Sequence, residues 1–444
     1  MERRPDLRIR PRSSYGLLAG DGVVPKGCRQ GLRPSPVFYW RSVCEWARSR
    51  GGLFNGFEWY SKAAEQNLAE AEFAIGLMYQ QGLGVLVDEA TTLKWFGCAI
   101  GHGDAGGWED FVEGFINIFG LGVPRDTKIA FEWMLKSAEK GNLYGQSLVG
   151  MWYHSGTSVL QDYGKAIQWL VSPATQGTAT AQHTVGSMHY HGQGVPQDKV
   201  QAFQWFLMAA DNELAVAMEE VGLMYCYSIG VDEDYEQAQV WLTKTATKGR
   251  VIAQRELGLL YLGGYCGAVD RPTAFEWFLK AAEQGDAVSQ GCVGHMYHHG
   301  RGADQDLEKA VEWLMQAAEQ GHPNAQQELG IMYCRGEGVP QNRSQGFQWC
   351  LRAAEQGYSH AQFDVGKMYH GGRGTFESHI KAVEWFRKAA EQGHARAQFE
   401  LGFAYISSKG VARNRDEALK WVKLAVEQGH VQAHALLDSI NRWD

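Results

Sequence analysis

WFRKAAEQGHARAQFELGFAYISSKGVARNRDEALKW, residues 385–421, begins and ends on tryptophan and contains one complete structural unit. Its segment AAEQG, at 389–393, combines good helix formers with a glycine, which commonly ends a helix in the left-handed conformation. In residues 397–405, apolar side chains recur every three or four positions, as one buried helix face requires. A Gly-containing loop and the next tryptophan-bearing helix follow. The stretch therefore predicts two helices joined by a tight turn.

The same pattern recurs along most of the chain, and it decides the fold. Nine of the ten intervals between its tryptophans are 36 residues long, and one is 38. These tryptophans lie at positions 59, 95, 133, 169, 205, 241, 277, 313, 349, 385 and 421. A glycine recurs inside the first helix at the same step, which indicates that a neighbouring helix packs closely there. A buried indole removes on the order of 200 Å² from water, so we expect these tryptophans in the core.

One helix pair cannot bury both of its faces, and stacking of tandem copies solves this problem. We therefore predict an all-α fold, a right-handed α/α superhelical solenoid of helix-turn-helix repeats with a period of 36 residues. Residues 1–34 are expected to be a disordered N-terminal segment, and 35–67 a degenerate first repeat. Residues 68–429 are expected to form ten repeats, and 430–444 a C-terminal capping helix.

Composition limits the function classes. The chain is 45% hydrophobic and 21% charged, with a formal net charge of −8, and an acidic body argues against a nucleic-acid groove. No apolar run approaches the roughly 18 residues that a membrane span needs, so membrane insertion is not expected. The eight cysteines form no CxxC motif and follow no repeat spacing, which favours reduced thiols and a cytoplasmic location. The arginine-rich N-terminus leaves a mitochondrial location as the alternative.

Residues 325–357 resemble the Sel-one-like repeat family, whose members are relatives of tetratricopeptide repeats. The resemblance is carried by Leu329-Gly330, Tyr333, Gly338-Val339, Trp349 and the segment AAEQG at 353–357, and it extends over roughly residues 56–433. It implies adaptor and assembly roles, so other proteins are the expected partners and no cofactor is expected. Some secreted relatives are proposed to hydrolyse cell-wall or β-lactam-like substrates, and an exported hydrolase is therefore the alternative function.

By analogy with tetratricopeptide arrays, the first helix of each repeat is expected to line the concave side, where a partner peptide or helix would bind. The positions that this analogy selects are His154, His183, Tyr190, His191, His295, His298, His299, Arg335, His360, Phe363, His370 and Phe399. They suggest a groove of imidazole and aromatic surface. The competing interpretation is that helix ends near loops simply tolerate polar residues.

Neither a metal site nor a catalytic residue is predicted. Zinc needs three or four ligands about 2 Å from one ion, whereas equivalent residues of adjacent repeats are expected about 10 Å apart. His298 and His299 are adjacent, so on a helix they point about 100° apart. The sequence contains no P-loop, no GxSxG and no HExxH. Its recurring GxG pairs lie in the loops between helices, which indicates turns rather than phosphate-binding loops.

Overall fold

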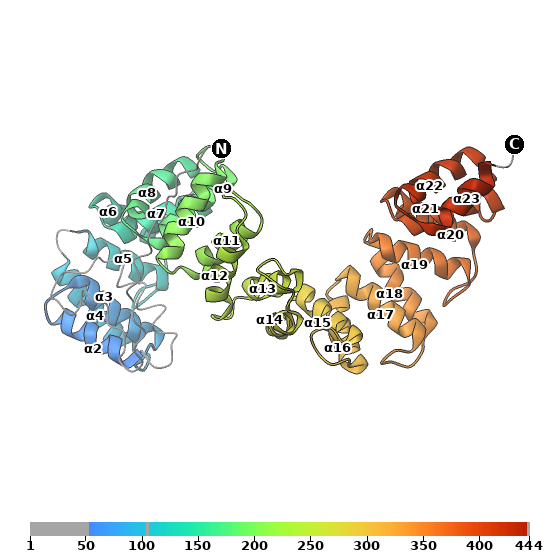
Figure 1. Cartoon of the computed structure of the whole chain (residues 1–444). Coiled ribbons are helices and arrows are strands. Elements are labelled where there is room, and N and C mark those ends of the chain that lie inside the picture. Colours follow the sequence, from blue (N-terminus) through green and yellow to red (C-terminus); the bar gives the residue numbers. More distant parts are fainter. Residues whose placement is uncertain (1–52, 104–105, 442–444) are drawn as a thin grey trace, which may run out of the picture. The chain divides into compact units, whose positions relative to one another are not determined.

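A computed structural model describes residues 53–103 and 106–441 of the chain, and all regular structure in this part is helical (Figure 1). The expected disordered segment 1–34 and most of the degenerate first repeat lie outside the described residues. The first helices of the repeats are α3 (Ala69–Gln81), α5 (Trp108–Phe119), α7 (Leu143–Ser155), α9 (Ala179–His191), α11 (Ala215–Cys226), α13 (Val251–Gly263), α15 (Ala287–His299), α17 (Pro323–Arg335), α19 (Ser359–His370), α21 (Ala395–Ser407) and α23 (Val431–Asn441).

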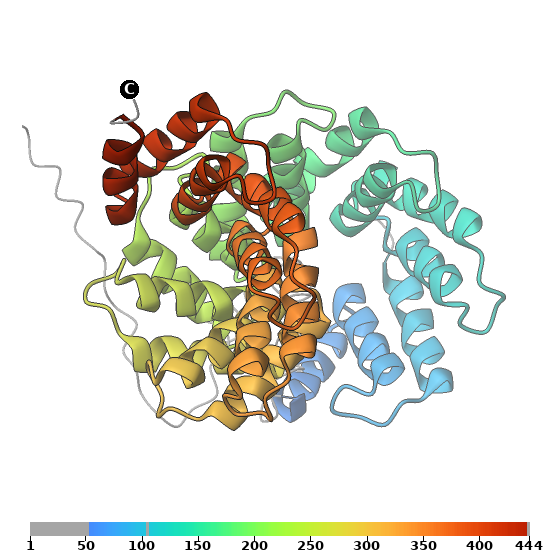
Figure 2. The same ribbon diagram turned by 90° about the vertical axis from the view of Figure 1, so that its right-hand side faces the viewer.

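The tryptophan-bearing second helices alternate with them along the chain. They are α2 (Leu53–Ala64), α4 (Glu89–His102), α6 (Thr127–Glu139), α8 (Tyr163–Thr175), α10 (Lys199–Asp211), α12 (Tyr235–Ala246), α14 (Arg271–Glu283), α16 (Leu307–Glu319), α18 (Arg343–Glu355), α20 (His379–Glu391) and α22 (Arg415–Glu427). From α4 on, each second helix packs alongside the first helix before it (Figure 1, Figure 2). The predicted solenoid of tandem helix pairs is confirmed. Contacts divide the chain into two compact units, Met1–Asn212 and Glu213–Asp444.

Local sequence sets where the second helices begin. The residue before most of them is an aspartate or asparagine whose side chain accepts a backbone N–H of the first turn, as Asp306 does from Lys309 at 3.0 Å. Such a cap satisfies a helix N–H that has no partner inside the helix. The turn after the second helix ends on a glycine at positive φ, for example Gly321 at 90° and Gly393 at 86°. Each boundary therefore follows from a residue that recurs with the repeat.

The recurrent glycine makes room for the residue that follows the next tryptophan. A β carbon placed on Gly366 would lie 2.6 Å from the Phe386 ring, and one on Gly150 would lie 2.5 Å from Leu170. Phe386 and Leu170 are almost fully buried. The two helices of a repeat therefore touch at a point where any larger residue would force them apart. The predicted close packing at this glycine is confirmed.

The expectation that the tryptophans form the core is confirmed in part, because most of them pack against the core while remaining partly exposed. Of the recurrent tryptophans, Trp241, Trp349 and Trp421 are buried, and the others are only half-buried. Often a lysine or arginine three residues later lies over the indole ring. The Lys388 ammonium, for example, lies 4.0 Å from the centroid of the Trp385 ring. Such a contact suits a ring that is partly in water. The core position is the next residue along the helix.

A ladder of glutamines joins consecutive repeats. The amide of Gln326 donates to the carbonyl of Ala318 at 3.0 Å, and its oxygen accepts from Gln356 at 2.8 Å. The same pair of bonds recurs one repeat later, where Gln362 donates to Ala354 and accepts from Gln392. Because Gln326 is 4% exposed, these bonds satisfy a side-chain amide that is largely out of reach of water. The glutamine before the capping glycine thus holds repeats together.

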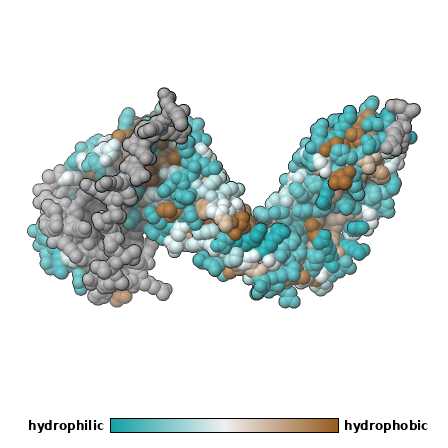
Figure 3. Space-filling view, in the orientation of Figure 1, coloured by the Kyte–Doolittle hydropathy of each residue, from teal (hydrophilic) through white to brown (hydrophobic). Residues whose placement is uncertain are grey.

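Within each unit, first helices of successive repeats contact one another, as α7 does with α9 and α15 with α17. First helices therefore lie on the inner side of the curve that each unit follows. The visible face of the described residues is mostly polar, with apolar side chains in small separate patches (Figure 3). In the described part of the chain, no helix is long and apolar enough to cross a membrane.

Candidate functional site

The residues predicted for partner binding all lie on first helices, and they are divided between the two units. His154, His183, Tyr190 and His191 lie on α7 and α9 of the first unit, and the others lie on α15, α17, α19 and α21 of the second. Phe363 is only 7% exposed, because its ring packs against Phe386 and stacks on His394, so it offers little surface. Partner binding at the remaining positions stays a prediction.

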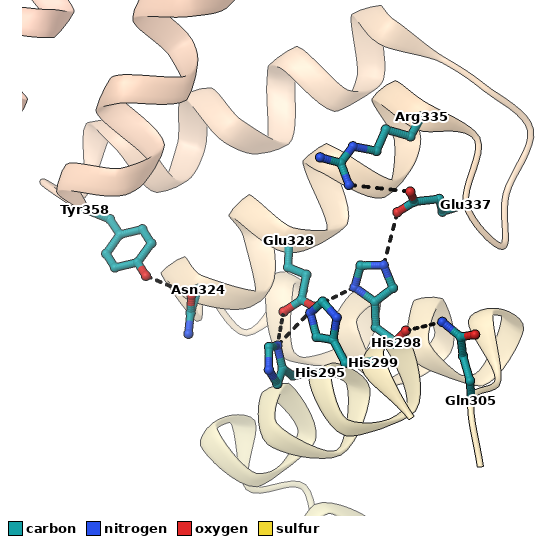
Figure 4. A network of polar contacts seen from close by, with 9 residues as sticks. All are labelled: His295, His298, His299, Gln305, Asn324, Glu328, Arg335, Glu337 and Tyr358. Atoms are coloured by element: carbon teal, nitrogen blue, oxygen red, sulfur yellow. Dashed lines mark hydrogen bonds and ion pairs between the residues drawn. The ribbon is translucent and has the colours of Figure 1, made fainter. Parts of the chain in front are cut away.

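Three of the predicted histidines meet in one cluster at the end of α15. His295 and His299 are one helical turn apart, and their ring centroids are 4.4 Å apart. The ring of His298 lies 4.5 Å from that of His299. Figure 4 shows the three imidazoles gathered around the carboxylate of Glu328, which comes from α17 of the next repeat. We refer to His295, His298, His299 and Glu328 as the histidine cluster.

The carboxylate of Glu328 is the centre of this cluster. Its oxygens lie 3.0 Å from Nδ1 of His295, 2.7 Å from Nδ1 of His298 and 3.5 Å from Nε2 of His299. Burial acts to raise the pKa of Glu328, but the hydrogen bonds and charges of His295 and His298 outweigh it, so the pKa is lowered. The carboxylate is therefore ionised at neutral pH and acts only as an acceptor.

The histidines differ in exposure and in surroundings. The His298 side chain is 10% exposed and also contacts Glu337 from the following loop, with 3.1 Å between Nε2 and the carboxylate. The His295 and His299 side chains are 43% and 41% exposed and lie at the rim. Burial and the neighbouring His295 lower the pKa of His299. His299 is therefore neutral at pH 7, with a ring nitrogen able to accept a proton or bind a ligand.

A pocket of about 460 Å³ opens beside the histidine cluster. It is lined by Leu262, Arg271, Val288, Gly291, Cys292, His295, Met296, Arg301, His322, Asn324, Ala325 and Glu328. Its wall thus combines apolar side chains with two arginines, two histidines and one carboxylate. The pocket lies entirely within the second unit, next to the contact between α15 and α17.

The pocket lies where α15 has a glycine at a position that carries an aromatic ring in α19 and α21. Phe363 and Phe399 stack on the histidines that begin the following first helix, with ring centroids 4.8 Å apart in the Phe399–His430 pair. The equivalent residue in α15 is Gly291. There, the imidazole of His322 faces the bare glycine, 3.1 Å from the position of a β carbon. The space that an aromatic ring occupies elsewhere is therefore open here.

The thiol in the pocket wall is not activated. Burial raises the pKa of Cys292 to about 11, and the carboxylates of Asp286 and Glu328 act in the same direction. A thiol is a nucleophile only as its thiolate, which is scarce at neutral pH when the pKa is this high. The pocket is thus better suited to holding a ligand than to attacking one covalently.

Residue spacing would have identified part of this site. His295 and His299 are four residues apart, so they point to the same side of a helix, unlike the adjacent pair on which the expectation of no metal site depends. The contribution of Glu328 comes from the next repeat, 33 residues after His295, and the repeat period alone does not show which side chains meet across that interface. Nothing in the sequence indicates that the glycine at position 291 opens a pocket.

Comparisons with known proteins show what the chain resembles. The model of the Sel1 repeat matches residues 55–68, 69–104, 114–142, 143–177, 179–214, 215–249, 251–286, 293–322, 323–358, 359–394 and 395–430. A search of curated proteins finds no match.

Two solved structures are similar over most of the chain. One is a protective antigen present in uropathogenic Escherichia coli strains that displays an SLR fold, with 30% identity and a TM-score of 0.57. The alignment covers 87% of this chain and 90% of that antigen. The other is a Sel1 repeat protein from Oxalobacter formigenes, with 29% identity, a TM-score of 0.58, and coverage of 74% of this chain and 93% of that protein.

Proposed function

The chain belongs to the Sel1 repeat family, and from this premise we propose that it is a protein-binding scaffold whose second unit holds a partner segment in the pocket beside Gly291. Sel1 repeat solenoids generally act as protein–protein interaction scaffolds. An array of this kind presents the inner row of first helices as an extended surface. The pocket is a concave, mostly preformed feature of that row, as ligand sites usually are.

The observation that carries the proposal is the missing side chain at Gly291. In α19 and α21, an aromatic ring packs on the histidine that precedes the next first helix and fills the corresponding place. At Gly291, the chain instead leaves a cavity of about 460 Å³, which is large enough for one apolar side chain of a partner. A partner residue seated there would pack against His322 in the way that Phe363 packs against His394.

The wall of the pocket indicates the chemistry of the partner. Leu262, Val288 and Met296 offer apolar contact. The guanidinium groups of Arg271 and Arg301 are exposed at the same pocket and suit a carboxylate. We therefore propose that the partner is a peptide segment that presents a large apolar side chain next to aspartate or glutamate.

Selection from a random linear peptide library on the immobilised full chain tests the proposal. We expect enrichment of peptides that combine a large apolar residue with a neighbouring acid. Gly291→Phe should abolish their binding, because the new ring fills the pocket as Phe363 does in its own repeat. His322 must yield by a few tenths of an ångström to admit it. Arg301→Glu should weaken the same peptides by opposing their acid.

The matched control is Gly101→Phe, the same change at an exposed helical glycine with nothing within 4 Å of its added β carbon. It lies in the first unit, far along the chain from the pocket, and should leave peptide binding unchanged. Equal peptide affinity in the wild-type chain and Gly291→Phe, with both folded by circular dichroism, would refute this pocket as the binding site.

We also propose that the protein works in a reducing compartment, with the cytoplasm as the first choice. The described cysteines, Cys98, Cys226, Cys266, Cys292, Cys334 and Cys350, are all unpaired. Thiol counting on protein isolated without reductant from its native cells tests this proposal. Blocked or paired cysteines would favour the exported alternative instead.

A further inference from the structure

We propose that His295, His299 and Glu328 form a binding site for a divalent transition-metal ion of the zinc type. Their ligand atoms lie within 4.8 Å of one another. The carboxylate of Glu328 is 3.0 Å from Nδ1 of His295 and 3.5 Å from Nε2 of His299. Neighbouring ligands of a tetrahedral zinc ion, with bonds of about 2.0–2.1 Å, are roughly 3.3 Å apart. The two imidazole–carboxylate separations already have this size.

The fold holds these three side chains in place through the core beside them. His295 follows the buried Gly294, which packs against Leu314, and Glu328 precedes Leu329, which is fully buried. The backbones of α15 and α17 are therefore fixed at the point where the ligands leave them. The imidazoles of His295 and His299 lie at the rim, so a small rotation of each ring closes the remaining gap between them.

A second layer of contacts orients the carboxylate. His298 lies between Glu328 and Glu337, with its two ring nitrogens 2.7 Å and 3.1 Å from their oxygens. Arg335 in turn contacts Glu337 at 3.5 Å, and the amide of Gln305 donates to the backbone carbonyl of His298 at 2.7 Å (Figure 4). Metal-binding carboxylates and histidines are usually held by such outer partners, which fix their orientation.

The chemistry of the donors selects the class of ion. Two imidazole nitrogens and one carboxylate oxygen suit zinc and its first-row neighbours, whereas calcium and magnesium prefer oxygen donors throughout. Three protein ligands leave at least one coordination position open. Because His295 and Glu328 also line the pocket, an ion bound between them would offer that open position to a ligand there.

The metal site does not depend on the proposed peptide binding, since the ion alone is the probe. In calorimetric titration of the full chain with Zn²⁺, we expect one equivalent whose affinity falls at least tenfold in His295→Asn/His299→Asn and in Glu328→Gln. His298→Asn should weaken the same equivalent by roughly tenfold, because it removes an outer contact and no ligand. Zinc should also raise the unfolding temperature of the wild-type chain but not of the double variant.

The matched control is His370→Asn/His379→Asn, which removes another histidine pair, with ring centroids 4.9 Å apart. It should retain the zinc equivalent that the first double variant loses. Equal zinc binding by the wild type and by His295→Asn/His299→Asn would overturn the proposal, and so would equal losses in the two double variants.

A crystal of the wild-type chain soaked in zinc gives a second answer that does not depend on any variant. An anomalous peak at the zinc edge between His295, His299 and Glu328 is the expected result. A fully soaked crystal with zinc peaks only elsewhere, for example on thiols, would overturn the assignment.

Discussion

The ring of Phe278 lies against Gly258 so closely that a β carbon on the glycine would be 2.6 Å from it. Gly258 is in α13 and Phe278 in α14, and both are buried in the contact between the two helices of one repeat. The phenylalanine is fully buried, so it has no free space into which it can turn. The distance between these helices is thus set by the absence of one methyl group.

Gly258→Ala should therefore destabilise the second unit, although alanine is the better helix former. We expect a loss of about 1–3 kcal/mol in the free energy of unfolding, the usual result of overpacking a core. Urea denaturation followed by circular dichroism measures it. Gly97→Ala is the control, because an added β carbon at Gly97 meets nothing within 4 Å. That variant should be neutral or slightly stabilising.

Gln326→Leu should break one step of the glutamine ladder. It leaves the amide of Gln356 and the carbonyl of Ala318 without the partners that Gln326 supplies. We expect a loss of about 0.5–1.5 kcal/mol in the free energy of unfolding, the usual net value of a hydrogen bond, because Gln356 is exposed to water and the Ala318 carbonyl still accepts from Gly321. Gln348→Leu, at an exposed position of the neighbouring α18, serves as the comparison in the same urea titration. Similar midpoints for the two variants would argue against a structural role for the ladder.

Ser408→Gly should stabilise the end of α21. Ser408 is in the left-handed conformation, with φ at 55°, at the C-cap position where α17 has Gly336 at φ 77°. For a residue with a β carbon, this conformation costs about 1–2 kcal/mol, whereas glycine adopts it without that cost. The reciprocal change, Gly336→Ser, should lose a similar amount. Thermal unfolding of both variants measures the two effects, and shifts of the same sign would contradict the explanation.

His394→Asn should flatten the pH dependence of stability. Nδ1 of His394 accepts the backbone N–H of Ala397 at 3.2 Å, which only an unprotonated nitrogen can do. Burial lowers the pKa of His394, and the charge of nearby His360 acts in the same direction. Below pH 6.5, the imidazole of His394 therefore binds a proton in the unfolded chain more readily than in the folded chain. The cap's contribution of about 1 kcal/mol should fade as the pH falls from 6.5 through the lowered folded pKa.

Asparagine also caps helices but does not titrate in this range, so His394→Asn keeps the bond and removes the pH effect. Urea midpoints collected between pH 7.5 and 5 should fall less in this variant than in the wild type. His434→Asn, at an exposed position outside any cap, should follow the wild-type curve. If His394→Asn and the wild type lose stability in parallel, the histidine cap is not the titrating element.

The period of the tryptophans was sufficient to predict the fold, because a repeat array is defined by local rules that recur. Even so, most of the recurrent tryptophans are only partly buried, and the residue directly after each of them lies in the core. Periodicity places a residue within its repeat, but it does not say which of two adjacent large side chains points inward. The recurrent glycine of the first helix could have identified the inward-pointing residue, because a side chain of the second helix packs directly against each of these glycines.

The candidate site was less predictable, because it depends on departures from the repeat. The histidines of α15 could be selected from the sequence, but Glu328 and Gly291 could not. Glu328 joins the cluster only through the packing of α17 on α15. Gly291 matters because α19 and α21 have phenylalanine at the same position. Features of this kind become visible when the repeats are compared in three dimensions.

The vacancy at Gly291 has a consequence for how such proteins diversify. In most folds, a new binding site requires many coordinated substitutions. Here, a phenylalanine at position 291 would close the pocket in α15. A glycine at the equivalent position of α19 or α21 would open a new pocket there, and the helical repeats would be unchanged. If the proposed pocket binds a partner, such exchanges would move the binding position along the array in steps of one repeat. Partners with the same anchoring residue would then bind at different repeats.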